Sequence, residues 1–180
     1  MTGPLEGVKI IDLTSMISGP MGAMILADQG AEVIKVEPPE GDLSRTFPPL
    51  LQNEITPYFA QQNAGKLFCS FNLSHDETPQ LVAELAAQCD VIVENFRPGV
   101  MAKYGLDYES LSKENPRLVY CSITGFGQTG PWANRRAYAP IGHLESGLIE
   151  YDQRKNDRPA RQPSLVLGDS VTALSAATKW

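Results

Sequence analysis

Short apolar runs, separated by amphipathic stretches, set the pattern of this chain. Five of the runs are rich in Val, Ile and Leu and too short for buried helices, which predicts strands. They span residues 8–13, 31–37, 67–71, 91–93 and 118–123. Helical spacing and start signals predict helices between the strands, as where Pro20 follows a capping Ser18 or Gly19. These helices cover residues 20–29, 57–62, 76–86, 100–104, 108–115 and 140–148.

Strands that alternate with helices are typical of a parallel sheet with helices on both faces. The first strand, helix and second strand together take about 30 residues, the length of one βαβ unit. The sequence therefore predicts an α/β fold, a Rossmann-like, doubly wound and mostly parallel sheet. Ligands of such sheets bind beyond the carboxyl ends of the strands, so the turns after the strands are the candidate functional positions.

The chain's last segment holds one acidic residue in a suggestive place. A strand is predicted over residues 164–167 and a helix from Ser170 onward, with Asp169 between them and a polar loop before them. By local pattern alone Asp169 is an N-cap carboxylate, which is a common structural role. The alternative is a nucleophile, because a helix N-terminus favours an ionised carboxylate and Gly168 leaves one side of it open.

Composition narrows the classes of ligand. The 180 residues suit one domain, and 15 Lys and Arg against 21 Asp and Glu give a net charge of −6. An acidic chain argues against a nucleic-acid or anionic-membrane partner. No apolar run reaches the ~18 residues of a membrane span, and no secretory signal opens the sequence, so a cytoplasmic location is expected.

The cysteines and histidines predict no metal site. Three cysteines and two histidines fall at spacings that match no zinc, disulfide or CxxC pattern. They are Cys69, Cys89, Cys121, His75 and His143. The thiols are expected to be buried in a reducing compartment.

Several basic residues lie on loops of the predicted ligand edge. Each one alone is typical of a solvated surface charge, but together they suit a polyphosphate ligand. They are Lys66, Arg97, Lys103, Arg135 and Arg136. Residues 125–130 also match G-x-G-x-x-G, yet they follow the fifth strand rather than the first, so this match indicates dinucleotide binding only weakly.

Several segments, in order, resemble the start of the class III coenzyme A transferases, the CaiB/BaiF type that includes formyl-CoA transferase and carnitine CoA-transferase. The strongest is Val91-Ile92-Val93-Glu94-Asn95-Phe96-Arg97-Pro98-Gly99, which is similar to that family's central signature. The others are residues 5–13, 19–20, 30–38, 41–42, 104–106, 115–120 and 125–131.

The resemblance implies a function. Asp169 falls where these transferases carry a catalytic aspartate, which attacks an acyl-CoA and passes through a mixed anhydride and an aspartyl-CoA thioester. The substrates would be an acyl-CoA and a carboxylic acid, with no permanently bound cofactor and no metal. The positions that match family CoA contacts are Ile17, Ser18, Lys66, Asn95, Phe96, Arg97, Lys103, Arg136 and Tyr138.

The resemblance also implies a larger assembly. Residues 1–180 would be the N-terminal part of the large, Rossmann-like CoA-binding domain, with a smaller second domain and a glycine-rich lid later in the chain. Two subunits would interlock as a homodimer. An apolar helix face of Val171, Leu174, Ala177 and Thr178 is then expected to be exposed, and the 180 residues alone to be inactive or partnered.

The sequence differs from the family's pattern at two positions, and two alternatives to a transferase remain open. Pro38 stands where members of the family often have an arginine, and Ala139 follows Tyr138 where many have an acidic residue. The related α-methylacyl-CoA racemases pair the aspartate with a histidine, but Tyr138 takes that position here and His143 is expected to be a packed helix histidine. A truncated, non-catalytic CoA-binding fragment is the other alternative.

Overall fold

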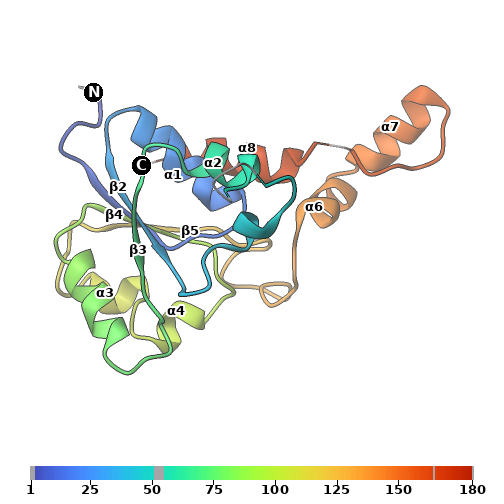
Figure 1. Cartoon of the computed structure of the whole chain (residues 1–180). Coiled ribbons are helices and arrows are strands. Elements are labelled where there is room, and N and C mark those ends of the chain that lie inside the picture. Colours follow the sequence, from blue (N-terminus) through green and yellow to red (C-terminus); the bar gives the residue numbers. More distant parts are fainter. Residues whose placement is uncertain (1–2, 51–54, 164, 180) are drawn as a thin grey trace.

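Five parallel strands form one sheet in the order β3-β2-β1-β4-β5 in the computed structural model, which describes residues 3–50, 55–163 and 165–179 (Figure 1). The strands are β1 (Lys9–Asp12), β2 (Glu32–Glu37), β3 (Leu67–Ser70), β4 (Val91–Glu94) and β5 (Val119–Ser122). This order reverses direction between β1 and β4, as in doubly wound folds. The predicted α/β class is confirmed.

Both faces of the sheet are buried because successive side chains of a strand point to opposite sides. Ile10 and Ile11 are neighbours in β1, each at most 1% exposed, and belong to two separate apolar cores. Ile10 aligns with Val33 and Val91, and Ile11 with Ile34 and Ile92. Consecutive apolar residues in the central strands are therefore explained by cover on two faces rather than one.

Helices form the covering layers (Figure 1). One face carries α1 (Ser18–Asp28), α2 (Pro57–Asn63) and α8 (Leu167–Ala177), and the other carries α3 (Thr78–Ala86), α4 (Val100–Lys103) and α5 (Tyr108–Leu111). A short 3-10 turn, η1 (Leu43–Thr46), follows β2. No helix of the described residues has both the length and the hydropathy of a membrane span.

The helices α1 and α8 pack tightly and run in the same direction. A Cβ on Gly22 of α1 would lie 3.3 Å from the carbonyl oxygen of Ala173 in α8, closer than most Cβ contacts, so the two backbones approach closely at this glycine. Toward their carboxyl ends, Leu26 and Ala177 line one small cavity. Ser18 and Asp169 lie four residues before Gly22 and Ala173, so the two helix starts are also neighbours.

The end of the chain corrects two sequence predictions. Leu165 and Val166 form no strand, and α8 begins at Leu167 rather than Ser170. This apolar run has no strand beside it to pair with and is solvent-exposed. Ser164 lies outside the described residues. Asp169 is thus in the first turn of α8 and not its N-cap, which is Val166.

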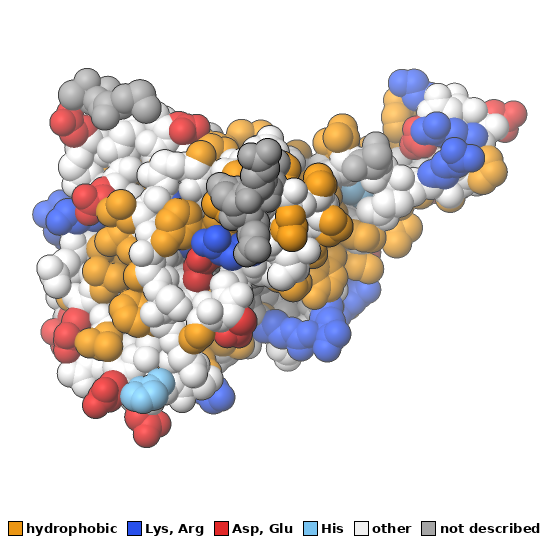
Figure 2. All heavy atoms as spheres, viewed as in Figure 1, with side chains coloured by type: hydrophobic (Ala, Val, Ile, Leu, Met, Phe, Trp, Pro, Cys, Tyr) orange, Lys and Arg blue, Asp and Glu red, His pale blue; other side chains and the backbone are white. Residues whose placement is uncertain are grey.

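A helix also replaces part of the predicted polar loop. The segments α6 (Ala139–Glu145) and α7 (Leu148–Asn156) project from the body, and Figure 2 shows Lys and Arg side chains gathered on this arm. The residues of α7 are mostly polar, so they show no apolar helical pattern and the helix was not predicted. An ion pair between Glu150 and Arg154, one turn apart at 2.5 Å, contributes to the helix.

Candidate functional site

The turn after β1 lies where the strand order reverses, the position at which doubly wound sheets bind ligands. Asn95, just after β4, connects the two loops: its Oδ1 accepts the N–H of Ser15 at 2.9 Å, and its Nδ2 donates to the Ser15 carbonyl at 2.9 Å. Met16 follows with φ of 71°, a left-handed conformation that side chains rarely adopt. Ile17 is then the N-cap of α1, and Ser18 is the first helical residue.

A cavity of about 570 Å³ opens beside this turn, within the size range of small-molecule sites. Its lining includes Ser15 after β1, Asp42 after β2, Leu73 after β3, and Phe96 and Tyr104 after β4. The carboxyl ends of four strands thus contribute to one cavity.

Two of the predicted basic residues are exposed and are sequence neighbours of residues that line the cavity. Arg97 follows Phe96, and Lys103 precedes Tyr104, with the Lys103 Nζ 5.3 Å from the centre of the Tyr104 ring. Neither side chain is held in an ion pair within the described part of the chain. Both charges are therefore available to an anionic ligand.

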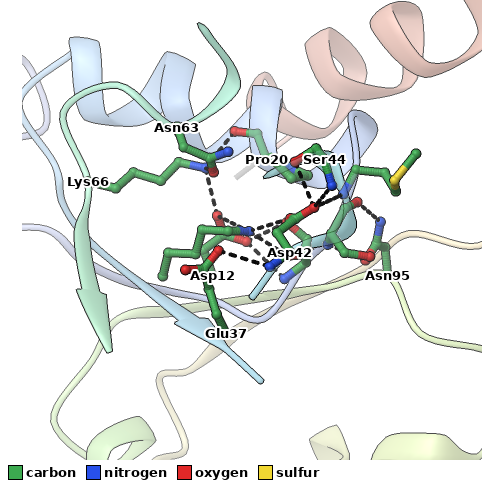
Figure 3. Close-up of polar contacts among 12 residues, drawn as sticks. Asp12, Pro20, Glu37, Asp42, Ser44, Asn63, Lys66 and Asn95 are labelled. Carbon is green, nitrogen blue, oxygen red and sulfur yellow. Dashed lines mark hydrogen bonds and ion pairs between the residues drawn. The ribbon is translucent and has the colours of Figure 1, made fainter. Parts of the chain in front are cut away.

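A buried cluster of four charges underlies the cavity (Figure 3). Lys66 Nζ lies 2.7 Å from Asp12 Oδ2, and Lys35 Nζ lies 3.1 Å from Asp42 Oδ2 and 4.0 Å from Asp12 Oδ2. Burial favours a raised pKa for both aspartates, but the lysine charges and hydrogen bonds outweigh it and the pKa of each is lowered. Two positive and two negative charges balance within the cluster.

Lys66 belongs to this cluster and not to the rim of the cavity. Its side chain is fully buried, and Nζ also donates to the Pro20 carbonyl at 2.9 Å and to Asn63 Oδ1 at 2.8 Å. All three donors of the ammonium are used, so none is free for a phosphate. Burial lowers the pKa of Lys66, an effect that Asp12 opposes.

The surroundings of Asp169 differ from those of the aspartates in the buried cluster. Its side chain is partly buried in the first turn of α8, where burial raises the pKa of the carboxyl and the charge of His143 acts in the opposite direction. Among the described residues, no lysine or arginine pairs with it. The helix dipole favours the ionised form at this position.

His143 is a packed and hydrogen-bonded helix residue, as predicted. It is 2% exposed, its Nε2 accepts the N–H of Gly168 at 3.2 Å, and its Nδ1 lies 3.3 Å from the Gln162 amide nitrogen. His143 thereby fixes the backbone one residue before Asp169.

Two tyrosines adjoin Asp169. Tyr138 is 69% exposed and precedes α6, whose first residue, Ala139, packs beside Gly168. The pKa of Tyr58 in α2 is raised by burial and by the charges of Asp169 and Asp42, so its phenol lies near both carboxylates. Nothing in the amino-acid pattern indicates Tyr58, because only the packing of the helix layer brings α2 near Asp169.

The site therefore combines an open cavity with a carboxylate at a helix start. Of the predicted residues, Ile17, Ser18, Asn95 and Phe96 gather around the reversal of strand order, and Tyr138 precedes Ala139, which packs beside Gly168. Arg136 is exposed on the loop before α6. Asp169 is not among the residues that line the cavity, so the two parts are adjacent and not one enclosed pocket. In the described part of the chain, no cluster of three His, Cys, Asp or Glu side chains is arranged to hold a metal.

Comparison with known proteins identifies the family. Residues 5–179 match CoA-transferase family III. The chain belongs to this family. Its resemblance to the CaiB/BaiF proteins extends to structure: a CAIB/BAIF family protein from Brucella suis superposes with a TM-score of 0.90 at 39% identity, covering 98% of this chain and 48% of that one.

The family's named relatives are CoA-transferases of several specificities. Succinyl-CoA:glutarate CoA-transferase of Mus musculus is 44% identical over 96% of this chain, and acetyl-CoA:oxalate CoA-transferase of Acetobacter aceti is 42% identical over 93%. The alignments cover 40% and 43% of those relatives. The chain thus spans about two fifths of the length of the curated relatives it matches.

Proposed function

We propose that this chain is the N-terminal, CoA-binding part of an enzyme that transfers coenzyme A between an acyl-CoA and a carboxylic acid, with Asp169 as the nucleophile. The observation that carries the proposal is the carboxylate at the start of α8, which has no cationic partner among the described residues. It lies beside the start of α1 in a chain that matches the transferase family over residues 5–179.

The reaction proceeds through two covalent states. An Asp169 carboxylate oxygen attacks the thioester carbonyl carbon, the C–S bond breaks, and the CoA thiolate leaves a mixed anhydride. The thiolate then attacks the aspartyl carbonyl, and the donor acid departs as a carboxylate. The acceptor carboxylate then attacks the carbonyl of the aspartyl-CoA thioester, the C–S bond breaks, and a second mixed anhydride forms as the CoA thiolate leaves. The thiolate attacks the acceptor's carbonyl in this anhydride, which gives the new acyl-CoA and releases the Asp169 carboxylate. Covalent catalysis of this kind conserves the thioester energy.

The cavity beyond the strand ends suits the nucleotide end of CoA. Its size accommodates such a group, and Arg97 and Lys103 at the rim are free to neutralise phosphates. The thioester end would extend past Ser18 toward Asp169, since the starts of α1 and α8 are neighbours. Lys66 has no part in this assignment, because its ammonium is fully engaged.

The transferase would be completed by further polypeptide and by an interlocked second subunit. Val171 and Leu174 on α8 are 59% and 51% exposed, while Ala173 between them is buried against α1. An apolar stripe of this kind stabilises a protein only when it is covered. The greater length of the relatives supports cover by a second domain or a partner subunit.

A racemase function has less support. Racemisation needs a second acid–base group facing the substrate's α-carbon. His143 is the nearest candidate, but it is 2% exposed and both of its ring nitrogens have partners. Tyr138, at the position of the racemase histidine, is exposed and carries a phenol in place of the imidazole.

Trapping tests the proposal directly. The protein is incubated with an acyl-CoA and then with hydroxylamine, and peptide mass spectrometry is used to look for an Asp169 hydroxamate. We expect the modification with acyl-CoA and not with free CoA alone. Modification of another carboxylate, or transfer to added acids with Asp169 never modified, would overturn the assignment of the nucleophile.

A further inference from the structure

The turn between β1 and α1 is held by side chains rather than by its own backbone. Asp12 Oδ1 accepts the N–H of Thr14 at 2.9 Å, and Lys35 Nζ donates to the Thr14 carbonyl at 2.7 Å. Asn95 takes both polar backbone groups of Ser15. Strands β1 and β2 and the loop after β4 thus each supply a side chain that fixes one of two consecutive residues.

Met16, the next residue, is the strained point of the turn. Its φ of 71° is unfavourable for a residue with a side chain, so neighbouring contacts must hold it there. Its N–H lies 3.3 Å from each carboxylate oxygen of Asp42, on the loop after β2. Asp42 is itself fixed by Lys35 at 3.1 Å and by the N–H and hydroxyl of Ser44 at 2.9 and 2.7 Å.

The direction of α1 depends on this residue. Met16 is followed by the N-cap Ile17 and then by Ser18 and Gly19, whose N–H groups have no acceptor within the helix. A Cβ on Gly19 would overlap the Thr14 side chain, so the turn and the start of α1 are in close van der Waals contact. A change at Met16 would therefore reorient the first amides of α1 beside Asp169.

We propose that Asp42, oriented by Lys35, is a positioning residue that holds Met16 in the left-handed conformation and thereby aims the start of α1 at the bound thioester. The inference rests on the proposed function for its effect on transfer, but its effect on the turn is independent of that function. Asp42 touches neither CoA nor the acid in this role. It acts through the backbone of Met16.

The neighbouring pair of Glu37 and Arg45 supplies the matched control. Arg45 Nη2 lies 2.6 Å from Glu37 Oε2, and its guanidinium stacks 3.6 Å from the centre of the Phe59 ring. Glu37 ends β2, and its Oε1 also accepts the N–H of Asp42 at 3.3 Å, but neither member of the pair has a hydrogen bond to residues 14–16. Arg45→Met should therefore lower stability without reorienting the turn.

The experiment compares Asp42→Asn with Arg45→Met in two readouts. Amide hydrogen exchange without substrate should be faster by about tenfold or more at Met16 to Gly19 in Asp42→Asn, the scale of a lost charge-assisted hydrogen bond, and unchanged in Arg45→Met. Transfer assays at a temperature where both variants are folded should show kcat falling about tenfold or more in Asp42→Asn alone. A purely structural role would lower both variants' midpoints and leave kcat of the folded enzyme unchanged.

A second pair of variants addresses the conformation of Met16 directly. Met16→Gly in the Asp42→Asn protein should recover part of kcat, because glycine adopts positive φ without strain. Met16→Val in the wild-type protein should reproduce the Asp42→Asn defect, and it supplies the test should Asp42→Asn not fold. If Asp42→Asn folds and leaves amide exchange at the turn unchanged, the inference is overturned. If Asp42→Asn does not fold, unchanged exchange in Met16→Val overturns it. If the wild-type protein transfers no CoA but amide exchange at the turn still changes in Asp42→Asn, the proposed function is overturned and the positioning role of Asp42 is retained.

Discussion

Asp12 and Asp169 lie near the starts of α1 and α8, two helices packed side by side, yet their surroundings act on them in opposite directions. Asp12 is fully buried, contacts Lys66 at 2.7 Å, and has a lowered pKa because the lysine charges outweigh its burial. Asp169 is only partly buried, has no lysine or arginine partner among the described residues, and has a raised pKa because burial dominates.

The contrast separates acids that hold the fold from an acid that can react. The Asp12 carboxylate is committed to Lys66 and to Thr14, so a substrate would have to displace buried partners to reach it. The Asp169 carboxylate needs no such exchange, and partial desolvation makes it a better nucleophile than a fully hydrated one. The Asp12 carboxylate, paired with Lys66, stabilises the turn, whereas the unpaired Asp169 carboxylate beside the turn remains able to react.

The largest expected effect is on transfer by Asp169→Ala. Loss of the nucleophile should reduce CoA transfer by ~10³-fold or more, while the free energy of unfolding stays within about 1 kcal/mol because no partner is orphaned. Steady-state transfer assays and urea denaturation measure the two effects. Glu150→Ala, an exposed acid on α7, is the control and should leave transfer unchanged. Near wild-type transfer by Asp169→Ala would remove the distinction between the two aspartates.

Asp12→Ala should give the reverse result in stability. It leaves Lys35 and Lys66 buried without their shared carboxylate, a change that typically destabilises by about 3–5 kcal/mol. Urea denaturation would measure the loss, with Arg154→Ala as a control that breaks an exposed pair contributing about 0.3–0.5 kcal/mol. Equal stability of Asp12→Ala and Arg154→Ala would contradict a structural role for the buried cluster.

The exposed basic residues at the cavity rim sharpen the comparison by adding a third kind of charge. Arg97→Ala and Lys103→Ala should each raise KM for acyl-CoA about tenfold and leave stability near wild type, because each removes one phosphate contact from solvent-exposed positions. Lys113→Ala is the matched control, an equally exposed lysine that follows α5 and lies away from the cavity. If all three variants have the wild-type KM for acyl-CoA, then Arg97 and Lys103 do not contribute to CoA binding.

Much of the fold was predictable because its signals are local. The five strands are short apolar runs, and Gly30 with its positive φ follows the end of the first helix as predicted. The predicted start was wrong: α1 begins at Ser18 after the N-cap Ile17, so Pro20 is its third residue, and neither Ser18 nor Gly19 is the cap. The prediction failed at residues 165–167, where an apolar run looks like a strand but has no neighbouring strand to pair with. It failed again at α7, whose polar face gives no helical signal apart from charge pairs such as Glu150 with Arg154.

The site was less predictable because its contacts are long-range. Lys66 looked like a phosphate ligand in the sequence, and only the fold brings it to Asp12, 54 residues away. One signal did point to the buried cluster: Lys35 interrupts an apolar strand, and a lysine inside a covered strand needs an acidic partner. The roles proposed for Asp169, Ile17, Ser18 and Arg136 remain predictions until substrate binding is measured.

The smallest effect, and the most specific test of the contrast, concerns the acid limb of the pH–rate profile. The nucleophile must be ionised, so kcat/KM should be full at neutral pH and fall as the pH drops through the raised pKa of Asp169, above its ordinary 3.8. The charge of His143 lowers that pKa, so His143→Gln should raise it and move the acid limb to higher pH. Glutamine retains a group that can accept the Gly168 N–H. Glu145→Gln, an exposed change on the same helix, should leave the limb in place. An unchanged limb, or a shift to lower pH, in His143→Gln would mean that the group titrating in the rate is not Asp169, and the contrast between the two aspartates would then lose its link to catalysis.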